Sequence, residues 1–165
     1  MTSLEGKLAE DISRFYSDPL GFVMYAYPWG QPGLLEHHDG PDVWQRDFLL
    51  QLGEEVRERA FDGIHPVKPI RMAASSGHGV GKSVLSAWLT DWIMSTRPRS
   101  KGTVSATTFT QLETRTWAAI VQWTRLCATG RWFNVSSEKM YFQGHKEAWL
   151  VSAQSCKEEN SEGFA

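Results

Sequence analysis

The chain has 165 residues, of which 41% are apolar and 22% are charged, a composition typical of one globular domain. Its formal net charge of −2 excludes a general basic field, so any contact with nucleic acid requires a local patch. The N-terminus is charged and amphipathic, unlike a signal peptide, and no apolar run approaches the roughly 18 residues of a membrane span. We therefore expect a soluble intracellular chain, without a membrane partner, whose cysteines Cys127 and Cys156 are reduced.

Helical periodicity organises the first third of the chain. Leu4, Leu8 and Ile12 recur at helical spacing and predict a helix over residues 3–17. Asp18 and Pro19 then provide the N-cap and the first position of a second, apolar helix. A third helix is expected from Pro41 to about Phe61, with Trp44, Phe48 and Leu52 on one stripe. Residues 1–63 are therefore predicted to be a helical N-terminal segment.

Strands and helices alternate in the rest of the chain. The pattern predicts a strand over 69–74, a helix over 82–96, a strand over 102–108 and a helix over 110–128. Two further strands, 140–142 and 148–153, are expected on either side of a turn. Because alternating strands and helices imply parallel strands with helical crossovers, residues 64–165 are predicted to form an α/β core with a mostly parallel sheet.

A glycine-rich loop, SSGHGVGKS, lies between the first expected strand and the helix after it. Successive backbone N–H groups of such a loop, with the following helix N-terminus, bind phosphate. In this pattern a lysine reaches the outer phosphates and a hydroxyl binds Mg²⁺, roles that fall to Lys82 and Ser83. The predicted nucleotide-binding residues of the loop are Ser76, Gly77, His78, Gly79, Val80, Gly81, Lys82 and Ser83.

The loop departs from the usual pattern G-x-x-x-x-G-K-[ST] by one position. Counting back from Lys82 places Ser76 where the first glycine is expected, with Gly77 one place later. The alternative interpretation is a chance match in a glycine-rich turn. The expected strand before the loop and the expected helix after it favour a phosphate-binding loop.

The runs RMAASSGHGVGKSVLSAWLTDWIMSTRP and TVSATTFTQLETRTWAAIVQW, with PDVWQRDFL before them, resemble the ATPase part of phage terminase large subunits, the motors that package viral DNA. The resemblance extends from about Asp18 to Ala165. It implies a P-loop NTPase core of the RecA or helicase type, ATP and Mg²⁺ as cofactors, and Ser83 as a Mg²⁺ ligand. It also implies that Gln45 reads adenine; a glutamine on the helix surface is the alternative.

The resemblance further implies double-stranded viral DNA, a portal protein and a small terminase subunit as partners, in the cytoplasm of a bacterial host. A strand ending in Asp-Glu, which such a motor needs for Mg²⁺ and the attacking water, is not recognisable, and neither is a nuclease domain. We therefore expect weak ATP binding with little hydrolysis, and name no catalytic residue. The alternatives are an inactive, truncated prophage remnant and another helicase-like P-loop ATPase.

Several weaker features have simpler interpretations. His37, His38 and Asp39 lack the spacing of a metal site and read as a solvated turn. The basic turn of Arg97, Arg99 and Lys101 is most simply a solvated loop, with DNA contact as the alternative. Thr108 or Thr110 is expected to cap the helix that follows. Tryptophans on the helix stripes are expected in the core; any left exposed would favour self-association.

Overall fold

The computed structural model describes residues 3–61, 64–75, 77 and 79–155. These residues form a mixed α/β protein that divides into two compact units, Met1–Val80 and Gly81–Ala165. This division lies 17 residues beyond the domain boundary expected after residue 63. The junction therefore lies within the glycine loop itself.

The first unit is helical. Its elements are α1 (Leu4–Ser13), α2 (Pro19–Ala26) and α3 (Val43–Arg59). Asp18 caps α2 as predicted, because its carboxylate accepts the Gly21 N–H at 2.8 Å. Each of its helices has fully buried apolar side chains: Ile12 on α1, Phe22 and Val23 on α2, and Leu49 on α3.

The strand expected over residues 69–74 is absent. These residues have no regular secondary structure, and Pro69, Arg71, Ala73 and Ala74 are exposed. An apolar stretch becomes a strand only where a neighbouring strand can pair with it, and this segment pairs with none within the described part of the chain. Pro69, like Pro66 before it, also removes a backbone donor.

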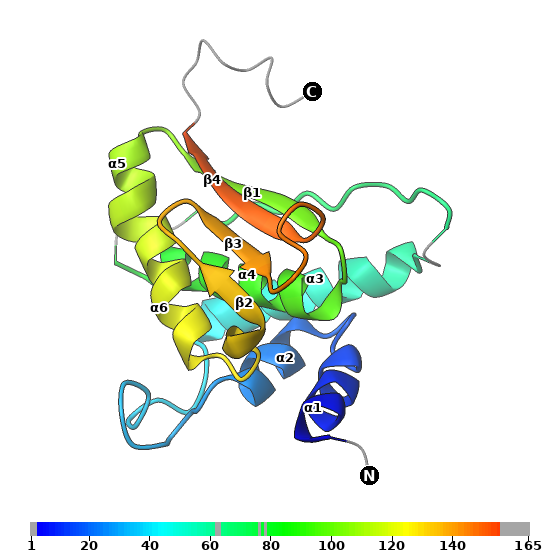
Figure 1. Ribbon diagram of the computed structural model, residues 1–165. Helices are drawn as coiled ribbons and strands as arrows, with labels where there is room; N and C mark the ends of the chain where they lie inside the picture. Colours follow the sequence, from blue (N-terminus) through cyan, green and yellow to red (C-terminus); the bar gives the residue numbers. More distant parts are fainter. Residues whose placement is uncertain (1–2, 62–63, 76, 78, 156–165) are drawn as a thin grey trace. The chain divides into compact units, whose positions relative to one another are not determined.

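The second unit contains the sheet and its covering helices. Its elements are α4 (Lys82–Thr96), β1 (Lys101–Ala106), α5 (Phe109–Gln111), the π-helix η1 (Leu112–Trp117), α6 (Ala118–Leu126), the 3₁₀ turn η2 (Gly130–Trp132), β2 (Phe133–Val135), β3 (Lys139–Phe142) and β4 (Leu150–Ser155). The strand order is β1-β4-β3-β2. In Figure 1 the helix α4 passes behind the sheet.

The sheet is mixed, which corrects the expectation of a mostly parallel one. β1 and β4 are parallel, whereas β4 with β3 and β3 with β2 are antiparallel. The reason is the length of the connections: three residues join β2 to β3 and seven join β3 to β4. Connections this short produce hairpins, whereas a parallel pair needs a crossover of a dozen or more residues.

One face of the sheet is packed against α4 and α6. Val151 and Met140, which lie side by side on β4 and β3, are buried. The Trp149 indole just before β4 donates to the Met94 carbonyl on α4 at 3.1 Å, and Trp88 of α4 meets Trp123 of α6 edge to face at 5.2 Å. Aromatic packing of this kind holds the helices on this face.

Candidate functional site: the glycine loop and the start of α4

On the Gly81 side, the loop ends in a helix N-terminus. Gly81 is the N-cap of α4 in the left-handed conformation (φ 85°, ψ 19°), which glycine adopts without the steric cost of a Cβ. α4 is 15 residues long, so its N-terminus has the partial positive charge of a full helix dipole. Lys82, which is exposed, and Ser83, half-buried, form its first turn. Such a helix start favours an anion.

On the Val80 side, the loop leaves space beside two of its glycines. A Cβ added to Gly77 or Gly79 would meet no atom within 4 Å, and Gly79 has a φ of 77°. A phosphate group approaches a backbone closely only where this space is left open. Ser76 and His78, the other predicted contacts in this part of the loop, lie outside the described residues.

The start of α3 reaches the glycine loop through Trp44. Its indole N–H donates to the Val80 carbonyl at 3.1 Å, a bond within the first unit. The sequence pattern placed Trp44 on an apolar helix stripe and missed this role. The available signal was the indole N–H, which usually finds an acceptor when the ring is partly buried.

Gln45, the predicted adenine reader, is buried with an exposed fraction of 4%. Its side-chain oxygen accepts the Asp42 N–H at 3.0 Å, and the Asp42 carboxylate accepts the backbone N–H of Gln45 in return. This reciprocal pair is a capping box that begins α3. Gln45 therefore has a structural role at the start of α3. Contact with adenine stays a prediction, and it would require the side-chain amide of Gln45 to bind adenine in addition to Asp42 or instead of it.

The strands of the second unit end in hydroxyls and amides near this helix start. Trp149, at the beginning of β4, binds Met94 near the end of α4, so the beginning of α4 lies toward the carboxyl ends of β4 and its parallel neighbour β1. Thr107 and Thr108 follow β1 there, and the Thr108 hydroxyl accepts the Gln111 N–H at 3.2 Å. Of the two predicted candidates, Thr108 and Thr110, it is therefore Thr108 that caps this helix.

Acidic and metal-binding side chains are sparse around these strand ends. β1 and β4, as described, contain no Asp or Glu. Asp91 on α4 has an exposed fraction of 1% and accepts the Thr124 hydroxyl at 2.7 Å, which directs it into the core. Within the described ranges, no three His, Cys, Asp or Glu side chains gather as metal ligands.

The basic turn after α4 is partly held in place. The Arg97 guanidinium lies 4.1 Å from the centre of the Trp92 ring and donates to the Thr96 hydroxyl at 2.7 Å. Arg99 and Lys101 are exposed. The expectation of a solvated loop therefore describes Arg99 and Lys101 but not Arg97.

No protein-family model, curated protein or solved structure matches this chain. Among the described residues, no helix combines the length and the apolar character that crossing a bilayer requires. The site therefore has to be interpreted from its own geometry.

Proposed function

We propose that the chain is a nucleotide-binding protein whose glycine loop, residues 76–83, binds the phosphates of ATP. The observation that carries this proposal is the left-handed Gly81 at the start of the 15-residue helix α4, followed directly by Lys82 and Ser83 and preceded by open space at Gly77 and Gly79. In this proposal the loop amides, the dipole of α4 and the Lys82 ammonium would all stabilise the same phosphate group.

The residues present suit ATP with Mg²⁺. Lys82 is exposed at the first turn and would neutralise the outer phosphates as a charge-assisted donor. The Ser83 hydroxyl would complete the coordination of the ion, which supplies charge neutralisation on the phosphate oxygens. The loop amides and the α4 N-terminus would hold and orient the triphosphate.

Within this proposal, the family that the sequence resembles gives the wider role: the ATP-binding part of a terminase-type motor. Double-stranded viral DNA, a portal protein and a small terminase subunit would be its partners in a bacterial cell. The support is the order of the matching segments along the chain and the contact of Trp44 with Val80, which brings the segment WQRDF to the loop.

A second candidate function is nucleotide binding without turnover. The observation that favours it is the chemistry of the strand ends, because the described β1 and β4 have no carboxylate and Asp91 is committed to Thr124. A carboxylate that positions water is worth several kcal/mol in phosphoryl transfer. An inactive prophage remnant would behave in this way, as would this chain if another segment supplies the carboxylate.

The test is equilibrium binding of labelled ATP with Mg²⁺ to the full chain and to Lys82→Ala. Loss of a charge-assisted contact to phosphate is expected to weaken binding about tenfold or more. Lys7→Ala, which removes an exposed lysine from α1, is the matched control and should bind as the original chain does. Equal binding by Lys82→Ala and the original chain would overturn the proposal.

Phosphate release under the same conditions separates the two candidate functions. A nucleotide-binding chain without turnover should release phosphate at the same slow rate with and without the Lys82→Ala change. Robust release that depends on Lys82 would favour the motor and would show that a carboxylate outside the strands described above completes the site.

A further inference from the structure

Charge is divided unevenly between the two units. Residues 1–80 contain 12 Asp and Glu against 7 Lys and Arg, whereas residues 81–165 contain 10 Lys and Arg against 7 Asp and Glu, of which four lie within residues 81–155. One of those four, Asp91, is buried and bonded to Thr124. The surface of the described second unit is therefore basic, although the whole chain is slightly acidic, and such asymmetry is typical of a chain that meets a polyanion.

Part of this positive charge lies on the face of the sheet that α4 and α6 leave uncovered. The strand register places Lys101, Leu150 and Tyr141 in one row across β1, β4 and β3. Thr103, Ser152 and Lys139 form the next row. Because side chains alternate between the faces of a sheet, both rows point away from the buried Val151 and Met140. We call this surface the open face.

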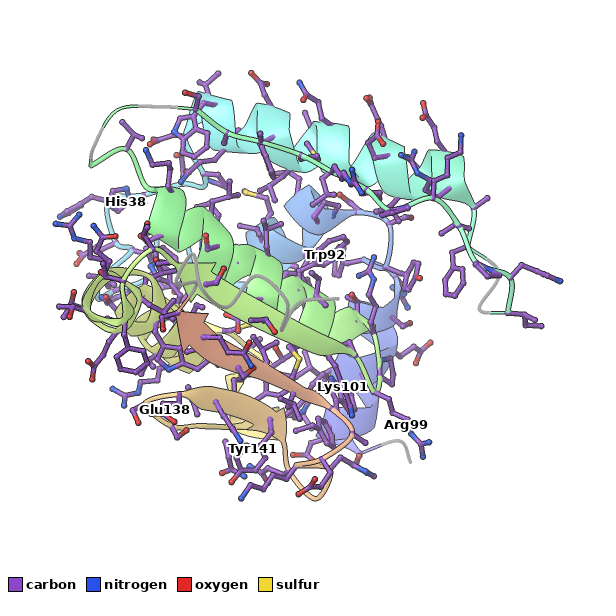
Figure 2. The ribbon with its side chains drawn as sticks, turned by 90° about the horizontal axis from the view of Figure 1, so that it is seen from above. His38, Trp92, Arg99, Lys101, Glu138 and Tyr141 are labelled. Atoms are coloured by element: carbon purple, nitrogen blue, oxygen red, sulfur yellow. The ribbon has the colours of Figure 1, made fainter. Side chains whose placement is uncertain are left out.

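One cation lies over the aromatic ring of the open face, and two more lie on the strands beside it. The Lys146 ammonium lies 5.8 Å from the centre of the Tyr141 ring. With strands about 4.8 Å apart, the Cα of Lys101 is about 10 Å from that of Tyr141, and the Cα of Lys139 is about 7 Å from it along β3. Figure 2 shows Arg99 and Lys101 at the end of the sheet where β1 begins, and Glu138 at the opposite end.

The remaining side chains of the open face are neutral hydrogen-bonding groups. Ser105 and Gln154 form a third row on β1 and β4, and Asn134 extends the first row onto β2. Every residue of these rows is exposed or half-buried. No Asp or Glu lies on the four strands. The surface thus combines cations, a ring and amide or hydroxyl groups.

We propose that the open face binds single-stranded nucleic acid. Lys101, Lys139 and Lys146 would contact phosphates, and the Tyr141 ring would stack on a base. The side chains between them are short, so no element projects far enough to enter the major groove of a duplex. Bases of a duplex are stacked on one another and are not available to Tyr141, which is why the ligand is a single strand.

Two other anionic ligands fit the open face less well. A lipid surface would be expected to meet protruding apolar or aromatic anchors, and Leu150, the apolar residue in these rows, is half-buried. An acidic peptide has no need of the amide of Gln154 or of an aromatic ring set among lysines. Both ligands are included as outcomes of the test.

This site is separate from the glycine loop. Of the open-face cations, Lys101 lies where β1 begins and Lys146 lies in the turn before β4, near the end of α4, while Lys139, opposite Ser152, lies further along the sheet. Lys82 is at the start of α4. A helix of 15 residues spans about 22 Å. The proposal therefore goes beyond nucleotide binding, and the Lys82→Ala variant is expected to bind oligonucleotides like the original chain.

The experiment measures fluorescence anisotropy of labelled oligo(dT) and oligo(U) of about 12 nucleotides, and of a duplex of the same length, with the full chain. The single strands are expected to bind at least about tenfold more tightly than the duplex. Affinity should fall steeply between about 50 and 200 mM salt, because bound cations displace counterions from the strand. The two single strands distinguish DNA from RNA.

Three variants locate the binding surface. The double variant Lys101→Gln/Lys139→Gln should weaken binding and lower the slope of log K against log salt by about 1.4, since each lysine contributes about 0.7 on a single strand. Tyr141→Thr, which keeps a β-former, should weaken binding about tenfold by removing the stacking ring. Arg115→Gln/Arg125→Gln, which removes two exposed charges outside the open face, is the matched control and should leave binding unchanged.

Several results would overturn the proposal. These are duplex binding as tight as single-strand binding, equal losses in the open-face and control variants, or tighter binding to anionic vesicles or poly-glutamate than to either oligonucleotide. Far-ultraviolet circular dichroism of each variant separates loss of the site from loss of the fold. If Tyr141→Thr unfolds, Tyr141→Leu with the same salt series replaces it.

Discussion

The two compact units differ in how their structure is encoded. The first unit is built from helices whose N-termini are determined by nearby residues. Examples are the Asp18 cap of α2 and the Asp42–Gln45 capping box of α3. The second unit depends on pairing between segments far apart in the chain, as in the alignment of Lys101 with Leu150. The helices of the first unit can therefore be predicted from short-range signals in the sequence. The sheet of the second unit forms only when strands that are far apart in the sequence pair with one another.

Large core truncations are expected to test whether the units are energetically separate. Phe22→Ala in the first unit and Trp117→Ala in the second each remove a side chain that is 2% exposed or less, at a cost of about 3–5 kcal/mol. Trp117→Ala also removes the hydrogen bond to the Ser136 carbonyl, 2.8 Å long. Hydrogen exchange read by mass spectrometry should show faster exchange confined to the unit that carries each change.

The control for these truncations is Leu50→Ala, whose side chain is 49% exposed, so stability should change by no more than about 0.5 kcal/mol. If Phe22→Ala accelerates exchange in β3 and β4 as much as in α2 and α3, the two units unfold together. Their stabilities would then not be independent.

An intermediate effect is expected inside the second unit, at the buried Asp91–Thr124 pair. Thr124→Val removes the hydroxyl that donates to Asp91 at 2.7 Å and leaves a carboxylate of 1% exposure with one donor fewer. We expect a loss of about 1–3 kcal/mol in the free energy of unfolding, measured by urea denaturation. Thr114→Val, at an exposed hydroxyl that bonds to the Thr110 carbonyl, is the control, and an equal loss there would contradict this account.

The smallest effect is expected in the first unit and depends on pH. The hydrogen bond to Asp11, followed by burial and by the negative charge of Asp11, raises the pKa of Tyr25 above its ordinary 10.0. Because the fold favours the neutral phenol, this contribution is fully present below pH 10 and is lost as the pH rises through the raised pKa of Tyr25. Tyr25→Phe should remove that part of the pH dependence of unfolding.

The measurement for Tyr25 is the difference in tyrosinate absorbance between the original chain and Tyr25→Phe during an alkaline titration. The lost component should titrate later than a free tyrosine. Tyr16→Phe is the comparison variant, and an early titration of the Tyr25 component would contradict the proposed bond to Asp11.

Most element positions were predictable, because the signals that start and end them are local. α4 spans Lys82–Thr96, as expected from its apolar periodicity. Thr108 caps the next helix as expected. The uninterrupted helix predicted over 110–128 is wrong in detail, since residues Leu112–Trp117 widen into a π-helix, a feature that helical periodicity does not predict.

The sheet and the site were less predictable, because both depend on partners. The apolar residues 69–74 have the pattern of a strand, but that pattern does not indicate which other strand they would pair with. β2 was missed because three residues give too short a pattern. In the site, the glycine spacing predicts a phosphate-binding loop, which stays a prediction. Neither the bond from Trp44 to Val80 nor the use of Gln45 as a cap has a signature in spacing alone.

One glycine in the second unit cannot be replaced by a larger residue without moving the backbone. A Cβ added at Gly130 would collide with the Thr124 carbonyl oxygen, a backbone atom that cannot rotate away as a side chain does. The Thr124 hydroxyl meanwhile binds Asp91, so this residue is constrained from both its backbone and its side chain. Any variant of this chain that keeps the turn between α6 and β2 must therefore keep glycine at 130.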